Sequence, residues 1–163
     1  MLTSGKPKVY VGSSTISYLT ARPTEDTIRR AKQIFTHQWW QHRESFELFI
    51  SRTVIDEIER GDPVAAGLRI EAVDGIPLLP LNENVERMAD VLLASGALPE
   101  NAALDAEHIA FSSVHKMDFL ITWNQRHIAT EKKRRQIEAI IEGFGYKPTR
   151  FFTPEQHLIF EES

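Results

Sequence analysis

The sequence has 163 residues, of which 42% are hydrophobic and 26% are charged, and its formal net charge is -4 at pH 7. These values are typical of a globular domain and exclude a disordered chain, and the length fits one domain that spans residues 1–163. The absence of cysteine excludes disulfides, thiolate nucleophiles and cysteine metal sites, so any metal ion must be held by oxygen or imidazole ligands.

The first part of the chain has the pattern of a strand followed by two helices. Residues 8–11 form a short apolar strand, and the turn residues 12–14 lead into a helix at 15–19. A longer helix follows at 23–41, because a proline and two acids begin it and apolar residues recur at three- and four-residue spacing. The chain therefore begins as strand, tight turn and helix.

The middle of the chain repeats this alternation. Residues 47–50 form the second strand, and a helix at 52–60 ends at a glycine. An Asp-Pro pair begins the next helix, over 62–75, with an N-cap and a first-turn proline. Residues 76–81 form a third strand flanked by prolines.

The last part of the chain completes the pattern. Helices are expected at 83–95 and 101–114, a fourth strand at 119–122, a helix at 132–144, and an edge strand at 150–152 before a short tail helix. Strands separated by helices pair in parallel through right-handed crossovers. The sequence therefore predicts an α/β fold, a three-layer α/β/α sandwich around a short, mostly parallel central sheet.

Polar residues that can carry chemistry are expected at one edge of this sheet. Ligands of such folds bind beyond the carboxyl ends of the strands. Residues 12–14 and Asn124 follow two of the strands, while Glu57 lies on the helix after the second strand and Asp105 on the helix before the fourth. Four segments far apart in the sequence can therefore meet there.

Asp105 has two interpretations. Its helix neighbours are largely apolar, and a buried carboxylate needs a companion such as a metal ion, a histidine or a helix N-terminus. His108 follows one turn later on nearly the same face. The alternative is a solvated acid beside a core imidazole whose hydrogen bonds are satisfied.

Together these segments resemble the PIN-domain family, of the VapC-like, toxin-type kind. The resemblance covers nearly the whole chain and runs through VYVGSSTISYL (9–19), Glu57, DAEHIA (105–110) and LITWNQRHIA (120–129). Each piece alone is a weak signal, whereas four pieces in the right order are more specific.

The resemblance implies a Mg²⁺- or Mn²⁺-dependent endoribonuclease that cleaves single-stranded RNA. It implies that Glu57, Asp105 and Asn124 are the catalytic residues and the metal ligands, since hard cations prefer carboxylate and amide oxygens. Ser14 and Arg126 are the expected substrate-binding residues.

Gly12 departs from the family pattern, which has an acid at the end of the first strand. Losing one negative charge beside a divalent ion weakens its binding by several kcal/mol at an effective dielectric constant of about 20. Two functions therefore remain open: an impaired ribonuclease, and a catalytically inactive PIN-fold module that binds RNA or a protein partner. A nucleotide-binding enzyme of the Rossmann type is disfavoured, because residues 12–14 contain a single glycine.

The expected partners follow from the resemblance and from the surface. An antitoxin protein and a homodimer are implied, and the aromatic pair Trp39-Trp40 offers a dimer surface. The basic run 132–135 is interpreted as a solvated helix face rather than an RNA contact. No apolar run approaches the roughly 20 residues of a membrane span, so we expect a cytoplasmic protein without membrane contact.

Overall fold

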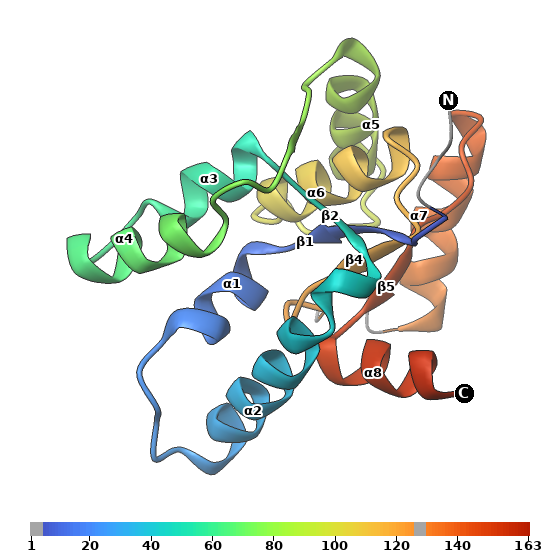
Figure 1. Ribbon diagram of the computed structural model, residues 1–163. Helices are drawn as coiled ribbons and strands as arrows, with labels where there is room; N and C mark the ends of the chain where they lie inside the picture. Colours follow the sequence, from blue (N-terminus) through green and yellow to red (C-terminus); the bar gives the residue numbers. More distant parts are fainter. Residues whose placement is uncertain (1–4, 126–129) are drawn as a thin grey trace.

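The computed structural model describes residues 5–125 and 130–163. Within these residues, five parallel strands form one sheet in the order β3-β2-β1-β4-β5 (Figure 1). The strands are β1 (Lys8–Val11), β2 (Glu47–Ser51), β3 (Leu78–Leu79), β4 (Phe119–Ile121) and β5 (Arg150–Phe152). The predicted α/β fold with a parallel central sheet is confirmed.

Helices cover both faces of the sheet, which gives three layers. Figure 1 shows α5, α6 and α7 on one face and α1, α2 and α8 on the other, with α3 and α4 beside α1. The bounds are α1 (Ser13–Thr20), α2 (Thr27–Gln41), α3 (Arg52–Ile58), α4 (Pro63–Ala72), α5 (Glu83–Ala94), α6 (Ala103–Val114), α7 (Glu131–Gly143) and α8 (Pro154–Glu162), with one 3-10 turn, η1 (Arg43–Ser45). In the described part of the chain, no helix is both long and apolar enough to cross a membrane.

The sheet order reverses beside β1, and this reversal places the candidate site. Strands β1 and β4 are neighbours in the sheet, and Val11 is paired with Ile121. The chain leaves β1 toward β2 and leaves β4 toward β5, in opposite directions across the sheet. A crevice beyond the carboxyl ends of two such strands is the usual ligand position in open α/β sheets. Gly12 and Thr122 stand at these two ends.

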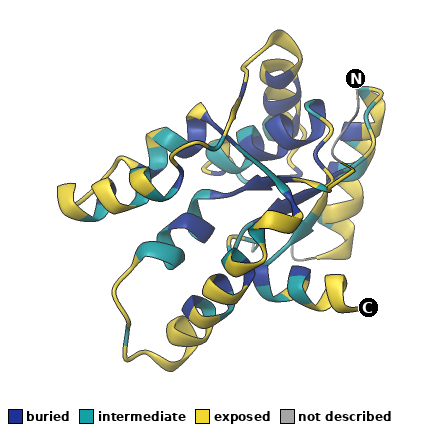
Figure 2. Cartoon of the chain, viewed as in Figure 1, coloured by how far each residue is buried: buried dark blue, intermediate teal, exposed yellow. Residues whose placement is uncertain are grey.

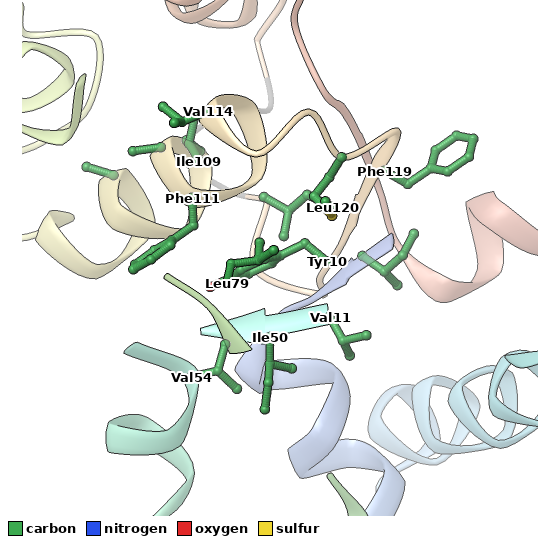
Figure 3. Packing of buried hydrophobic residues seen from close by; sticks show 14 of the residues in the cluster. Tyr10, Val11, Ile50, Val54, Leu79, Ile109, Phe111, Val114, Phe119 and Leu120 are labelled. Carbon is green, nitrogen blue, oxygen red and sulfur yellow. The ribbon is translucent and has the colours of Figure 1, made fainter. Parts of the chain in front are cut away.

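The core explains why these segments form strands. Val9, Tyr10 and Val11 are each 0% exposed, as expected of a central strand covered on both faces. Figure 2 shows the buried residues concentrated in the sheet and on the inner faces of its helices. Figure 3 shows Ile109 of α6 and Val54 of α3 among the side chains packed around the strands.

Several elements differ from the prediction in their bounds; helix α2, for example, begins at Thr27 rather than at residue 23, with Asp26 as its N-cap. Strand β3 has two residues instead of the predicted 76–81, because the prolines at 77 and 80 lack the amide hydrogen that a longer ladder needs. Helix α1 begins at Ser13 rather than at residue 15, directly after the strand-end glycine. The early start brings Ser13 and Ser14 into the first helical turn at the candidate site.

Candidate functional site

Gly12 closes the carboxyl end of β1 against β4. Its amide donates a hydrogen bond to the carbonyl oxygen of Ile121 at 2.9 Å, and it is the N-cap of α1 without a side-chain hydrogen bond. A Cβ atom added at Gly12 would lie 3.0 Å from Cβ of Thr122, 3.1 Å from the Ile121 carbonyl oxygen and 3.2 Å from Oγ1 of Thr122. The backbone at Gly12 has ordinary extended angles, so close packing rather than conformational freedom makes glycine fit.

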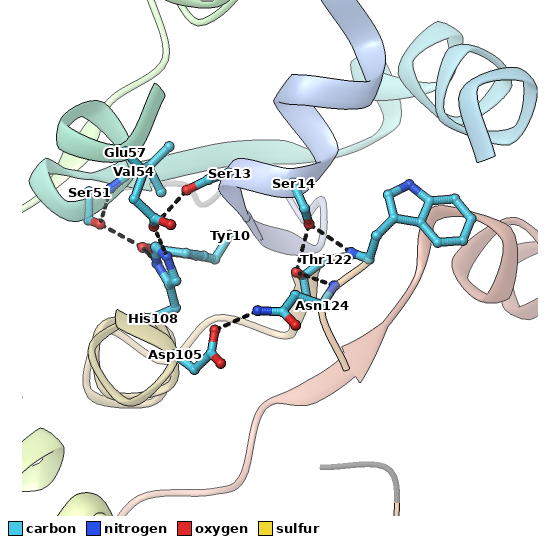
Figure 4. Close-up of polar contacts among 11 residues, drawn as sticks. Tyr10, Ser13, Ser14, Ser51, Val54, Glu57, Asp105, His108, Thr122 and Asn124 are labelled. Atoms are coloured by element: carbon cyan, nitrogen blue, oxygen red, sulfur yellow. Dashed lines mark hydrogen bonds and ion pairs between the residues drawn. The ribbon is translucent and has the colours of Figure 1, made fainter. Parts of the chain in front are cut away.

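Glu57 lies on α3, and two neighbours hold its carboxylate (Figure 4). The hydroxyl of Ser13 donates to Oε1 of Glu57 at 2.8 Å, and Nε2 of His108 lies 2.5 Å from the same oxygen. Burial raises the pKa of Glu57, but the hydrogen bond and charge of His108, the Ser13 hydroxyl and the charge of Arg60 outweigh burial and hold that pKa below its ordinary value. Glu57 therefore favours its ionised form.

His108 continues the hydrogen-bond chain into the core. Its Nδ1 lies 2.6 Å from the Tyr10 hydroxyl, which lies 2.6 Å from Oγ of Ser51. Because the ionised Glu57 can only accept, Nε2 of His108 donates to it, while Nδ1 accepts from the Tyr10 hydroxyl when the imidazole is neutral and donates to it when the imidazole is charged. Burial raises the pKa of Tyr10 far above its ordinary value, so Tyr10 stays protonated. His108 is therefore a core histidine whose hydrogen bonds are satisfied, as the alternative interpretation of the sequence expected. The acid beside it, however, is Glu57 and not Asp105.

Asp105 and Asn124 form a second, separate pair. The Nδ2 amide of Asn124 donates to Oδ1 of Asp105 at 2.9 Å. Asp105 also lies in the first turn of α6, where a negative charge is favourable beside the free backbone amides. The helix N-terminus is one of the stabilising partners expected for the Asp105 carboxylate. The side-chain amide of Asn124 is a partner that was not among those expected.

Ser14 and Thr122 fix the end of β4. Oγ of Ser14 accepts a hydrogen bond from the backbone amide of Trp123 at 2.9 Å and lies 3.0 Å from Oγ1 of Thr122. The amide of Asn124 donates to Oγ1 of Thr122 at 3.0 Å. The hydroxyl of Ser14, predicted to bind substrate, is therefore engaged in holding the strand end.

A small cavity lies between these groups. Its volume is about 30 Å³, which is room for a water molecule or a small ion but not for a nucleotide. The polar part of its lining comes from Asp105, His108, Thr122 and Asn124, next to Gly12. The other lining residues are Leu98, Ile109 and Leu120. Glu57 does not line this cavity, because its carboxylate is turned to Ser13 and His108.

The three predicted metal ligands are divided between two hydrogen-bond systems. Within residues 5–125 and 130–163, no three His, Asp or Glu side chains are grouped so that they could hold one ion. The two predicted carboxylates belong to different hydrogen-bond systems, one with His108 and one with Asn124. The described residues therefore contain no preformed group of three acidic or imidazole side chains for an ion, and the metal requirement and its three predicted ligands stay predictions.

Other predicted residues have different positions. Arg126 lies outside the described residues. Trp39 is 0% exposed and donates from Nε1 to Nδ1 of His157 at 2.8 Å, so it adds nothing to a dimer surface. Trp40 is half-buried, with the Arg43 guanidinium 4.9 Å from the centroid of its ring. The aromatic argument for a homodimer therefore does not hold, and the dimer rests on the family resemblance.

Three residues at the site were not predicted from the sequence, two in the hydrogen-bond chain of His108 and one at the end of β4. Tyr10, Ser51 and Thr122 carry hydroxyl groups at or next to buried strand positions. A polar group at such a position requires a hydrogen-bond partner. That requirement is the feature of the sequence from which these residues could have been predicted to join a hydrogen-bond network.

Comparisons of the chain with family models, curated proteins and solved structures gave no match. The family resemblance accordingly rests on the four sequence segments.

Proposed function

We propose that the chain is a PIN-type domain of the VapC-like kind whose hydrolytic centre is incomplete, so that it binds single-stranded RNA without cleaving it efficiently. The observation that carries the proposal is the closed packing at Gly12. The position where the resemblance places the first acid has no side chain, and its space is taken by Thr122 and the Ile121 carbonyl group.

The state of Glu57 supports the same conclusion. A metal ligand needs lone pairs directed at the ion, whereas Oε1 of Glu57 already accepts from Ser13 and His108. Freeing this oxygen would leave the hydrogen bond of His108 without an acceptor in a largely buried place, at a free-energy cost of about 1–3 kcal/mol. An ion could therefore be bound through Oε1 of Glu57 only at the expense of these hydrogen bonds.

A slow ribonuclease is the second candidate. The observation in its favour is that Asp105 and Asn124 contact each other and line the same cavity as Gly12. Two of the three predicted ligands therefore face the place where the resemblance expects the ion.

Binding and cleavage of RNA separate the two candidates. A labelled single-stranded RNA of mixed sequence would be titrated with the protein, by fluorescence anisotropy in EDTA and in Mg²⁺, and the same mixtures would be run on denaturing gels. We expect saturable binding in both buffers and no cleavage above the level of buffer alone. Metal-dependent cleavage by the parent protein would establish the ribonuclease instead, and a lack of RNA binding in both buffers would overturn the proposal.

Direct metal titration provides an independent check. We expect calorimetry to show no saturable Mn²⁺ binding by the parent at submillimolar concentrations, and no difference between the parent and Asp105→Asn. Asp105→Asn is nearly isosteric and removes one ligand charge. Tight Mn²⁺ binding that Asp105→Asn abolishes would show that an ion assembles the centre and would contradict the proposal.

A further inference from the structure

A groove lies at the amino ends of β1, β4 and β5, at the opposite end of the sheet from the candidate site. Its volume is about 630 Å³, the size of a small-ligand pocket. Three segments line it, and each lies shortly before a strand: residues 5–7, 116–118 and 145–148. Its charged lining residues are Lys6, Lys116, Lys147, Arg150 and Asp118.

The groove is positively charged in a protein whose formal net charge is -4. The carboxylate of Asp118 accepts a hydrogen bond from the backbone amide of Lys8 at 2.8 Å. Among the described residues, neither Lys116 nor Lys147 has a carboxylate within 4.0 Å, and the guanidinium of Arg150 lies over the ring of Phe160. Lys116, Lys147 and Arg150 thus lie in one groove with no carboxylate of the described residues within 4.0 Å of them, which favours an anionic ligand.

Lys116 has an unfavourable backbone conformation. It ends α6 with a φ of 59°, in the left-handed region, and its amide donates to the Ser113 carbonyl while that of Met117 donates to the Ser112 carbonyl. This C-cap pattern usually has glycine at the left-handed position, because a side chain there costs about 1 kcal/mol. In the described chain, the other five residues with positive φ are all glycines. A lysine at this position therefore points to a role beyond the helix end.

Tyr146 adds an aromatic ring to the groove. It is half-buried, and its hydroxyl accepts a hydrogen bond from Nδ2 of Asn84 at 3.1 Å, which fixes the ring at the groove. Lysine ammonium groups bind phosphate as point charges, and aromatic side chains stack on nucleobases. The combination suits a nucleic-acid strand better than an acidic peptide.

We propose that this groove binds the phosphate backbone of single-stranded RNA, through Lys116, Lys147 and Arg150. The inference rests on the proposed function in the choice of RNA, but it concerns a different surface. An RNA strand bound there contacts the amino end of the sheet and leaves the crevice at Gly12 free.

A double variant tests the groove, and a matched double variant on α7 serves as the control. Lys116→Gly with Lys147→Gln removes two positive charges from the groove, and Lys132→Gln with Arg134→Gln removes two from exposed positions in the first turns of α7. RNA affinity would be measured by anisotropy over a range of salt concentrations. Each lost phosphate contact should weaken binding about 5-fold at 0.1 M salt and make the slope of log affinity against log salt shallower by about 0.7.

We therefore expect about 25-fold weaker binding for the groove variant and a change of less than about 3-fold for the control. The single change Lys116→Gly should raise the melting temperature while weakening RNA binding, since glycine relieves the left-handed conformation. If Lys116 had no role other than ending α6, replacing it with glycine would leave RNA binding unchanged.

The outcomes separate this inference from the proposed function. If the parent binds RNA and the groove variant and the control variant weaken that binding equally, the groove is not the RNA-binding surface. The proposed function would then still stand. No RNA binding by the parent would overturn both. Displacement of RNA by a poly-glutamate peptide at equal charge concentration would assign the groove to an acidic protein, and displacement by submillimolar inorganic phosphate would assign it to a small phosphate ligand; either result would overturn the RNA assignment.

Discussion

The hydroxyl of Tyr10 lies 2.6 Å from Nδ1 of His108, although the two residues are 98 positions apart in the sequence. This contact joins the central strand β1 to α6, and the other nitrogen of His108 extends it to Glu57 on α3. The residue that most resembles a catalytic acid is therefore the last member of a chain of hydrogen bonds that begins in the core. Measurements of the free energy of unfolding can decide whether this series of hydrogen bonds stabilises the fold.

Replacing Tyr10 with phenylalanine should destabilise the protein by about 1–3 kcal/mol. The variant keeps the ring but leaves Nδ1 of His108 and Oγ of Ser51 without their buried partner. Urea unfolding at pH 7.5 measures the loss. Tyr18→Phe is the matched control, because among the described residues the Tyr18 hydroxyl has no hydrogen bond, and it should change the free energy of unfolding by less than about 0.5 kcal/mol. Equal losses in the two variants would show that this series of hydrogen bonds contributes nothing.

The lowered pKa of Glu57 predicts a loss of stability in acid. A carboxyl group whose pKa is lower in the folded than in the unfolded state stabilises the fold above the unfolded pKa, and this contribution is lost as the pH falls through the folded pKa. Glu57→Gln keeps an oxygen acceptor for Ser13 and His108 but removes the charge. We expect it to lower the free energy of unfolding by about 1 kcal/mol at pH 7 and to reduce the fall in stability between pH 5 and pH 3, measured by urea unfolding. If the free energy of unfolding of both proteins falls in parallel over this pH range, the charge of Glu57 does not contribute to stability through these hydrogen bonds.

His157 predicts a second pH effect at higher pH. Its side chain is 0% exposed, Nδ1 accepts from Trp39, and burial lowers its pKa to about 4. The unfolded chain binds a proton near pH 6.5 and the folded chain does not, so stability present above pH 6.5 should decline as the pH falls from 6.5 to 4, although Oε1 of Glu161, 3.3 Å from Nε2, favours the charged imidazole and reduces the decline.

His157→Phe provides the comparison for this effect. A phenyl ring suits the surroundings, where the ring of Phe119 lies 4.4 Å and that of Phe46 4.8 Å from the imidazole. The variant should be less stable at pH 7.5, because Nε1 of Trp39 loses its acceptor, and its stability should depend less on pH between 6.5 and 4.5. Chemical denaturation at four pH values measures both effects. An unchanged pH dependence would mean that other groups cause it.

The sequence could predict the order of elements and the place of the site, but not the contacts within the site. Alternation of strands and helices is enough to predict a parallel sheet, and Gly12, Asp105 and Asn124 line one cavity as expected. The resemblance assigns Glu57 to a metal ion, and the sequence pattern alone cannot show that Ser13 and His108 contact its carboxylate. That pairing depends on how α3 and α6 pack across β1, a tertiary relationship that no local spacing records.

The same limit explains the interpretation of Trp39. Its helical spacing placed it on the core side of α2, but the neighbouring Trp40 suggested surplus aromatic surface. In the structure, α8 covers Trp39 through His157, more than 100 residues later in the chain.

The last prediction concerns Gly12, where three substitutions separate size from charge. Gly12→Ala adds only the Cβ atom, which meets Thr122 and the Ile121 carbonyl oxygen at 3.0–3.2 Å, so the ends of β1 and β4 must move apart by a few tenths of an ångström. We expect a loss of about 1–2 kcal/mol, since overpacking outweighs the gain from a less flexible unfolded chain. Thermal unfolding in EDTA measures this loss.

Gly12→Asn and Gly12→Asp then have the same shape and differ in charge. In EDTA, Gly12→Asp should be the less stable of the two, because its carboxylate joins Asp105 at one cavity, and Mn²⁺ should raise its melting temperature but not that of Gly12→Asn. If the missing acid is what prevents hydrolysis, Gly12→Asp should also cleave single-stranded RNA in Mg²⁺ about 100-fold faster than the parent, which corresponds to about 2.7 kcal/mol of transition-state stabilisation. Gly12→Asn should stay as slow as the parent. If the parent cleaves RNA as fast as Gly12→Asp, or if Mn²⁺ stabilises the two variants equally, then the glycine is not what leaves the centre incomplete, and the account of this site is wrong.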